Sequence, residues 1–275
     1  MKLKIPALIC FFSAFLAGFI FQYPNQATNV TAKAVGIISE QKINQLKQYD
    51  VIYLGENHDR AEHHAAELEI ITQLDQAQAN SKTRLAIGLE MFQRPFQPIL
   101  DLYLSGEISE AELREQTEYD TRWGFDWEFY APILRFAQEN KIPLIALNTP
   151  AEVTQKVAET GLDSLKDGNF RYILPLAEIK LDNQEYRQKM AEVYQAHAQN
   201  GQGNSSDQEN FYAAQVLWDE TMADAIARYY NNHPQSQIVV LVGKAHVMDN
   251  YAIPERVNRR IKDKSFSQTS FLLEE

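Results

Sequence analysis

The sequence predicts an α/β domain in which a mostly parallel central sheet is flanked by helices on both faces, with a helical insertion. Short apolar runs alternate along the chain with longer segments in which apolar residues recur at helical spacing. The short runs are apolar at almost every position, which is typical of strands that are buried on both faces. Strands that alternate with helices in this way form parallel sheets, because a crossover must connect each strand to the next.

Two strands and four helices are expected in the first half of this domain. Residues 50–54 and 84–91 are the apolar runs that we interpret as strands. The expected helices are residues 61–77, 95–104, 110–117 and 127–140. In the last of these, Phe129, Ile133 and Phe136 share one helical face, which would pack on the sheet.

The second half is expected to supply three more strands. These strands are residues 142–147, 237–242 and 269–273. A helix should begin after the first of them, with Thr149 as its N-cap and Pro150 at its first position. Ser206 and Glu209 form a capping-box pattern for a second helix. The later expected helices are residues 182–198, 206–230 and 254–262. Residues 151–203 contain no clear strand, so we expect a helical insertion over the sheet edge.

The N-terminal segment, residues 1–34, has the composition of a signal peptide or an N-terminal anchor, and residues 35–275 would form the α/β domain. Lys2 and Lys4 precede the uncharged apolar stretch 7–21, which is shorter than the ~20 residues of a typical membrane-spanning helix. If this segment is not cleaved, it would hold the protein at a membrane surface. We therefore expect an exported protein of the periplasm or of the membrane-associated cell envelope.

The composition excludes several kinds of site and partner. Of the 275 residues, 45 % are hydrophobic and 23 % are charged, which is ordinary for a globular domain. The single cysteine, Cys10, lies in the N-terminal apolar stretch. The α/β domain therefore lacks the thiols for disulfides, cysteine-ligated zinc sites and iron–sulfur clusters. A net charge of −11 without a basic patch argues against nucleic acid as a partner.

Polar residues that can bind metals or transfer protons follow the predicted strands. Glu56 and His58 follow the first strand, and Glu90 lies at the end of the second. His246 comes three residues after Gly243, which ends the fourth strand. Parallel strands have their carboxyl ends at one edge of the sheet, where ligands of open α/β sheets bind. We therefore expect the two histidines and two glutamates to lie in one pocket.

Two imidazoles and two carboxylates in one pocket suit two kinds of chemistry. His58, Glu90 and His246 can hold a divalent metal such as Zn, Mn or Fe. The same pocket can transfer protons to and from a bound water, with Glu56 as the base. Structural roles are the alternatives, with Glu90 as an exposed carboxylate, His58 as a helix cap and His246 as a loop anchor.

Aromatic residues accompany these groups. The stretch WGFDWEFY, residues 123–130, can pack as helix core or form an apolar wall for a flat ligand. We interpret Trp218 as a core residue and Asp219 as a hydrogen-bond partner of a histidine. Tyr251 follows His246 by five residues and is either an iron ligand or a loop anchor.

Five motifs occur along the chain in a fixed order. They are GENHDRAEHH, GLEMFQRPFQP, IPLIALNTP, AQVLWDETMA and VVLVGKAHVMDNYAIPERV, and they span roughly residues 50–262. As a set they resemble the ChaN-like haem-binding proteins of the Tiki superfamily. The resemblance implies a ChaN/erythromycin-esterase-like α/β fold. Its more distant relatives are erythromycin esterases and Tiki metallopeptidases, which use similar histidine and glutamate positions.

The resemblance implies an envelope protein that binds haem in haem or iron uptake. It supports the four strand-end residues as the core of the site and adds His64, because a histidine pair recurs after the first motif in the family. Adjacent helical residues point in different directions, so at most one of His63 and His64 should face the pocket. The expected haem-binding residues are His58, His64, Glu90, His246 and Tyr251. The candidate cations for the haem propionates are Arg94, Arg122 and Lys244.

Two functions therefore remain open from the sequence. In the first, haem or another small ligand is the partner, held by one chain or between the subunits of a homodimer. In the second, the protein is a divalent-metal-dependent hydrolase, a peptidase or an esterase, with the same histidines and glutamates. Glu56 would be catalytic only in the second.

Overall fold

The structure of the protein is a computed structural model that describes residues 38–78, 83–166, 171–199, 205, 207–248 and 251–273. The predicted signal peptide or anchor lies outside these residues. Within the described part of the chain, no helix is both long enough and apolar enough to cross a membrane.

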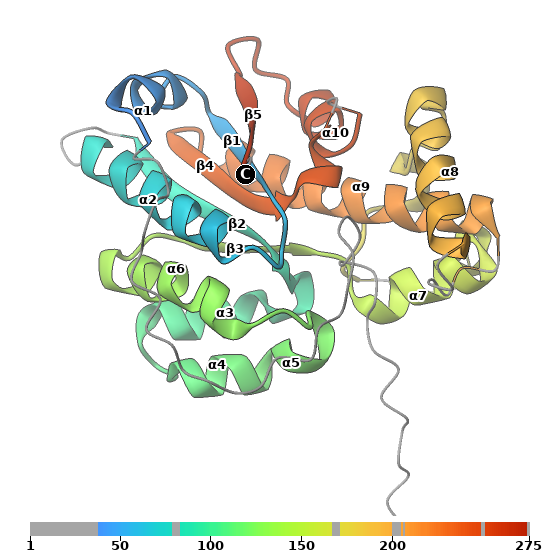
Figure 1. Ribbon diagram of the computed structural model, residues 1–275, viewed down its shortest axis with the longest axis horizontal. Coiled ribbons are helices and arrows are strands. Elements are labelled where there is room, and N and C mark those ends of the chain that lie inside the picture. The colour runs from blue at the N-terminus through green and yellow to red at the C-terminus, as the bar shows by residue number, and fades with distance from the viewer. Residues whose placement is uncertain are drawn as a thin grey trace, which may run out of the picture.

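The described residues form one five-stranded sheet in the order β3-β2-β4-β1-β5, and every neighbouring pair is parallel (Figure 1). The strands are β1 (Val51–Glu56), β2 (Arg84–Gln93), β3 (Leu144–Asn148), β4 (Ser236–Gly243) and β5 (Gln268–Leu272). The predicted parallel α/β fold is confirmed. Both β1 and β2 continue two residues past their predicted ends, so Glu56 and Glu90 lie within the strands.

Helices cover both faces of the sheet because the side chains of each strand alternate between two apolar cores. Ile52 and Leu54 of β1 belong to the core beneath α2, α3 and α6, whereas Val51 and Tyr53 belong to the core beneath α9 and α10 (Figure 1). Each fully buried aliphatic side chain of these cores contributes about 1.5–3 kcal/mol. The covering helices are α2 (Ala61–Gln78), α3 (Gln97–Ser105), α6 (Trp127–Asn140), α9 (Gln208–Asn232) and α10 (Ile253–Arg260).

Shorter elements complete the fold. The short helices are α1 (Glu40–Leu46), α4 (Glu110–Gln116) and α5 (Tyr119–Arg122). The 3-10 turns are Arg94–Phe96, Leu162–Leu165, Leu176–Glu178 and Lys244–His246. α4 begins with a capping box, in which the Ser109 side chain accepts from the Glu112 backbone N–H and the Glu112 carboxylate accepts from the Ser109 backbone N–H.

The expected helical insertion consists of α7 (Ala151–Thr160) and α8 (Gln184–Gln199). Together with the first half of α9 it forms a third core, which includes Val157, Tyr186 and Phe211. The insertion packs on α9. It lies beside the carboxyl ends of the strands and extends the molecule at that end (Figure 1).

Two expected helix caps differ in the structure. Pro150 still has extended backbone, with ψ 128°, and α7 begins at Ala151 without a side-chain cap. Thr149 is therefore one residue too early to be the N-cap. At α9 the N-cap is Asp207, whose carboxylate accepts from the backbone N–H of Asn210 at 2.8 Å. The expected cap, Ser206, lies outside the described residues.

Candidate functional site

Carboxylates and imidazoles alternate along a continuous buried path at the carboxyl edge of the sheet. Neighbouring members of this path are separated by 2.5 to 4.0 Å between their closest polar atoms. Tyr186 ends the path by donating its hydroxyl to Asp219. We call this path the acid–imidazole chain; in spatial order its members are Glu67, His64, Glu56, His58, Glu90, His246, Asp219 and Tyr186.

Glu56 is the carboxylate at the centre of the first half of this chain. Strand alternation carries it to the face that α2 and α6 cover, because it is two residues beyond Leu54. Its Oε1 atom accepts from Nδ1 of His58 at 2.5 Å and from the hydroxyl of Tyr130 at 2.6 Å. Burial raises the pKa of Glu56, but hydrogen bonds with His58 and His64 outweigh it and hold the pKa well below its usual range. Glu56 is therefore a buried carboxylate ion.

His58 lies between Glu56 and Glu90. Its Nε2 atom is 4.0 Å from Oε2 of Glu90, and that oxygen accepts from the backbone N–H of Gly243 at 2.7 Å. A β-carbon at position 243 would lie 2.7 Å from Nε2 of His58. The absence of a side chain at this glycine lets the imidazole approach the backbone of β4.

His246 ends the short turn after β4 and links Glu90 to α9. Its Nδ1 atom is 2.6 Å from Oδ1 of Asp219, and its Nε2 atom is 3.5 Å from Oε1 of Glu90. Burial lowers the pKa of His246, but the charges of Glu90 and Asp219 outweigh it and raise the pKa to about 9. Asp219 thus has the role of histidine partner that the sequence suggested, and Tyr186 orients Asp219 in turn.

His63 and His64, the histidine pair at the start of α2, are both buried, at 3 % exposure each, and only His64 joins the acid–imidazole chain. Nδ1 of His63 accepts from the backbone N–H of Asn57, so His63 has a structural role. His64 stacks on Phe129 with ring centroids 4.9 Å apart and joins the acid–imidazole chain. Adjacent helical residues are both buried here because α6 and the loop after β1 enclose the first turn of α2.

Sequence reasoning missed three members or close partners of this chain. Glu67 lies three residues after His64 on α2, a spacing that places the two side chains on one helical face. Nδ1 of His64 is 3.1 Å from Oε2 of Glu67. The local spacing could have found Glu67. Tyr130 and Tyr186 have no such signal, because only the docking of α6 and α8 brings their hydroxyls to the site.

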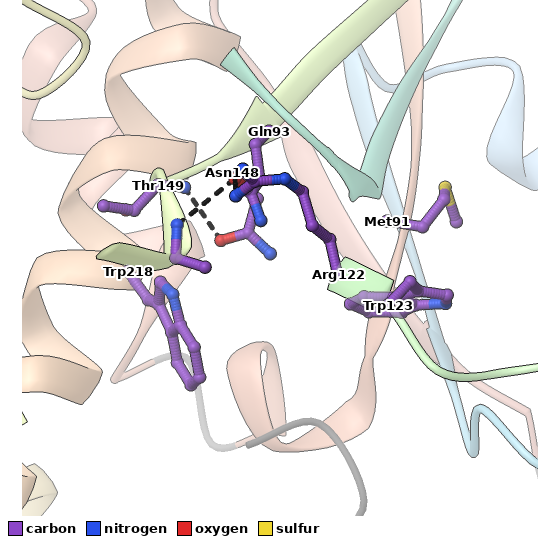
Figure 2. Close-up of a pocket in the computed structure, with 8 residues that line it drawn as sticks. Met91, Gln93, Arg122, Trp123, Asn148, Thr149 and Trp218 are labelled. Carbon is purple, nitrogen blue, oxygen red and sulfur yellow. Dashed lines mark hydrogen bonds between the residues drawn. The ribbon is translucent and has the colours of Figure 1, made fainter. Parts of the chain in front are cut away.

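A pocket opens beside His58 and His246. It has an empty volume of about 320 Å³, part of it open to solvent. Trp123 and Trp218 border it from opposite sides, with Arg122 between them (Figure 2). The ring of Trp123 lies 4.8 Å from that of His58, and the ring of Trp218 lies 6.3 Å from that of His246. The other lining residues are Met91, Gln93, Asn148, Thr149 and Ala151.

The two tryptophans of the stretch 123–130 are both core residues, at 3 % exposure each, and Trp123 also lines the pocket. The indole N–H of Trp127 donates to Glu110 at 2.8 Å. Trp218, which we interpreted as core, is only partly buried against the α9 core and also forms a pocket wall. The reading as core thus holds for residues of the stretch 123–130, whereas its role as a wall for a flat ligand stays a prediction.

The remaining predicted residues lie around this arrangement. Tyr251 is half-buried against the third core, and its carbonyl accepts from the guanidinium of Arg256. The structure thus gives it contacts outside the acid–imidazole chain. Arg94 pairs with Asp224 at 2.9 Å. Lys244 is half-buried in the turn after β4. Arg122 is the candidate cation that lines the pocket.

Comparison with known proteins gives one family match. The family model described as haem-binding uptake, Tiki superfamily, ChaN matches residues 42–257. Among curated proteins, RETICULATA-RELATED 5, chloroplastic, of Arabidopsis thaliana is 24 % identical over 245 residues, which are 84 % of this chain and 32 % of that protein. The chain thus spans about a third of the length of this relative.

Two solved structures are similar to this one. ChaN of Campylobacter jejuni, described with cofacial haem binding, has a TM-score of 0.67 and 20 % identity, with 86 % of each chain covered. This likeness shows the shared fold. An erythromycin esterase in its open conformation has a TM-score of 0.48 and 14 % identity, covering 85 % of this chain and 72 % of the esterase. That score is too low to support an inference.

Proposed function

This chain belongs to the haem-binding uptake, ChaN family of the Tiki superfamily, and on that premise we propose that it binds haem in the pocket between Trp123 and Trp218. The observation that carries the proposal is the pairing of each pocket wall with a buried histidine: Trp123 with His58, and Trp218 with His246. A flat aromatic ligand between these indoles would lie beside both imidazoles.

The residues of the pocket fit the chemistry of haem. Haem supplies an iron that takes an imidazole nitrogen as an axial ligand, and its propionates need cations. The half-buried indole of Trp218 offers an apolar surface to the macrocycle, and the buried Trp123 borders the pocket on the other side. Arg122 lines the pocket and has a side chain that is 20 % exposed. It is held in place by Glu118 and Glu152, each at 2.8 Å, so it is an oriented cation beside the pocket.

In this proposal His246 would hold the haem iron. Its Nδ1 atom is engaged by Asp219, which leaves Nε2 as the ligand atom. Metal-bound histidines characteristically make such a bond through the other ring nitrogen, which fixes the ring and raises its basicity. Nε2 of His246 faces Glu90 at 3.5 Å, so Glu90 is the group that would have to accommodate the iron.

Partial coverage of haem is the basis for proposing a homodimer. The empty volume of about 320 Å³ is partly open to solvent, so this pocket does not enclose a flat ligand on all sides. A macrocycle seated here would keep part of one face outside, and a second subunit would cover it. Light scattering with and without haemin tests this, because we expect the mass to double at one haemin per chain.

A haemin titration tests the proposed function. The wild-type chain should give a shifted Soret band that saturates at stoichiometric haemin. His246→Ala should weaken binding at least about tenfold, by loss of the axial ligand. His233→Ala is the matched control, because His233 is exposed and stacks on Tyr229. Absence of a Soret shift in the wild-type chain, or an unchanged affinity of the His246 variant, would reject the proposal.

The hydrolase alternative required Glu56 as a general base. A base must reach a bound water, but Glu56 is 1 % exposed and its Oε1 atom is engaged by His58 and Tyr130. We therefore propose that Glu56 orients His58. Metal analysis and hydrolysis assays on Glu56→Gln separate the two functions, since a loss of hydrolysis with retained metal would support the base.

We also propose that the protein works in the periplasm or at the membrane-associated cell envelope. The support is Lys2, Lys4 and the apolar stretch 7–21. Fractionation of cells that produce the full chain with a C-terminal tag, with mass determination of the mature N-terminus, tests both export and cleavage. Recovery in the cytosolic fraction with an intact N-terminus would contradict this proposal.

A further inference from the structure

We propose that Glu56, His64 and Glu67 form a second ligand site, which binds a divalent transition-metal ion at the inner end of the acid–imidazole chain. One ligand atom from each of the three side chains lies within 4.8 Å of the other two. An imidazole with two carboxylates is a donor set that suits Zn²⁺ or Mn²⁺.

The orientation of His64 is the first argument. Its Nε2 atom lies 3.1 Å from the carbonyl oxygen of His58, an acceptor that requires Nε2 to carry a proton. Nδ1 thus faces Oε2 of Glu67, at 3.1 Å, and Oε2 of Glu56, at 3.4 Å. A proton on Nδ1 holds the three atoms together here, and a divalent ion in its place would bind all three. A carbonyl on the other ring nitrogen is also the usual partner of a metal-bound histidine.

Two orphaned carboxylate oxygens are the second argument. Oε2 of Glu56 and Oε1 of Glu67 are buried without a hydrogen-bond partner. The two residues are 1 % and 0 % exposed. A buried carboxylate oxygen without a partner is strongly unfavourable. The ion pairs of both carboxylates within the described residues are to histidines, and a divalent ion would satisfy both oxygens.

The residues around the proposed site hold its ligand side chains in place. The hydroxyl of Tyr130 donates to Oε1 of Glu56 at 2.6 Å, which leaves Oε2 turned toward His64. The ring of His64 is enclosed by Phe129 and Tyr130, with centroid distances of 4.9 and 4.5 Å. These contacts hold the His64 ring and the Glu56 carboxylate in place.

This site is separate from the proposed haem pocket. The three residues are not among those that line the pocket. They communicate with it through Glu56, whose Oε1 atom engages His58. The metal proposal therefore does not depend on haem binding, and each can fail alone.

Zn²⁺ itself is the probe. The full chain would be produced with Zn²⁺ in the medium, dialysed against metal-free buffer and analysed for metal by mass spectrometry. We expect one Zn²⁺ per chain, and a higher Tm than for protein produced without Zn²⁺, because the ion binds only the folded state. Glu67→Gln keeps the shape of the side chain and should weaken binding at least about tenfold. Glu62→Gln is the control, since its side chain is 69 % exposed on the same helix.

The outcomes are distinct. Loss of Zn²⁺ in Glu67→Gln and in His64→Gln, with normal circular dichroism and unchanged haemin binding in Glu67→Gln, would support the inner site. A Zn²⁺ content that is lost in His246→Ala but kept in Glu67→Gln would place the ion at the outer histidines and overturn the proposal. Wild-type chain without Zn²⁺ would overturn it as well.

Discussion

Gly243 and His58 are in such close contact that a β-carbon on the glycine would lie 2.7 Å from Nε2 of the imidazole. The same glycine donates its backbone N–H to Glu90. Gly243, at the end of β4, thus constrains the positions of both His58, which follows β1, and Glu90 of β2. The geometry of the site therefore depends on the backbone of β4 as well as on the titratable side chains.

Gly243→Ala should displace His58 and destabilise the protein by about 1–3 kcal/mol, as overpacking of a tight site does. Urea unfolding measures the change. The double variant with His58→Ala is the control, because removal of the imidazole makes room for the added methyl group. If Gly243→Ala costs as much in that background as in the wild type, the contact is not the cause.

Trp218→Leu should weaken haemin binding about three- to tenfold, because one aromatic wall of the pocket is lost. A Soret titration measures the affinity. Phe266→Leu serves as the comparison, since Phe266 packs on Tyr230 near the end of α9 that is remote from the pocket. Equal haemin affinity of the Trp218 variant and the wild type would mean that the ligand lies elsewhere.

Tyr130→Phe should lower the free energy of unfolding by about 1.5–3 kcal/mol, because its hydroxyl donates to the buried carboxylate of Glu56. Chemical denaturation gives the value. Tyr103→Phe is a matched control, since the hydroxyl of Tyr103 is buried without a hydrogen-bond partner. We expect little loss or a gain there, and equal losses in the two variants would contradict the role assigned to Tyr130.

The ion pair between Glu110 and Arg135, which joins α4 to α6, should make stability depend on pH. A hydrogen bond with Arg135 holds the pKa of Glu110 below its usual 4.5. A lowered pKa stabilises the folded state above pH ~4.5, and this contribution is lost as the pH falls through the folded-state value. Unfolding measurements between pH 6 and 3 should show that Arg135→Gln lowers the free energy of unfolding by up to about 1 kcal/mol at pH 6.

The effect of the same substitution should shrink as the pH falls toward 3, because Glu110 loses its charge on protonation. Glu110→Gln provides the companion test, because Arg135→Gln should cost little in that background. A cost of Arg135→Gln that is equal at pH 6 and pH 3 would show that packing of the arginine, rather than its charge, stabilises the junction.

The succession of strands along the chain and the edge at which they end were accessible from the sequence. Runs such as residues 84–91 and 237–242 are apolar throughout, and only a doubly covered parallel sheet buries such runs. Parallel strands then bring Glu56, His58, Glu90 and His246 to one edge whatever the register. That inference needed no knowledge of how the helices dock.

The partners of those residues were decided by tertiary structure. Tyr130 and Tyr186 reach the site only because α6 and α8 pack where they do. Hydrophobic packing is non-directional, so the spacing of residues along the sequence does not predict where these helices dock. Whether His63 or His64 joined the site depended on how α2 meets the loop after β1. The sequence by itself determined which groups meet at the sheet edge, whereas helix packing decided which hydroxyls and carboxylates complete their hydrogen bonds.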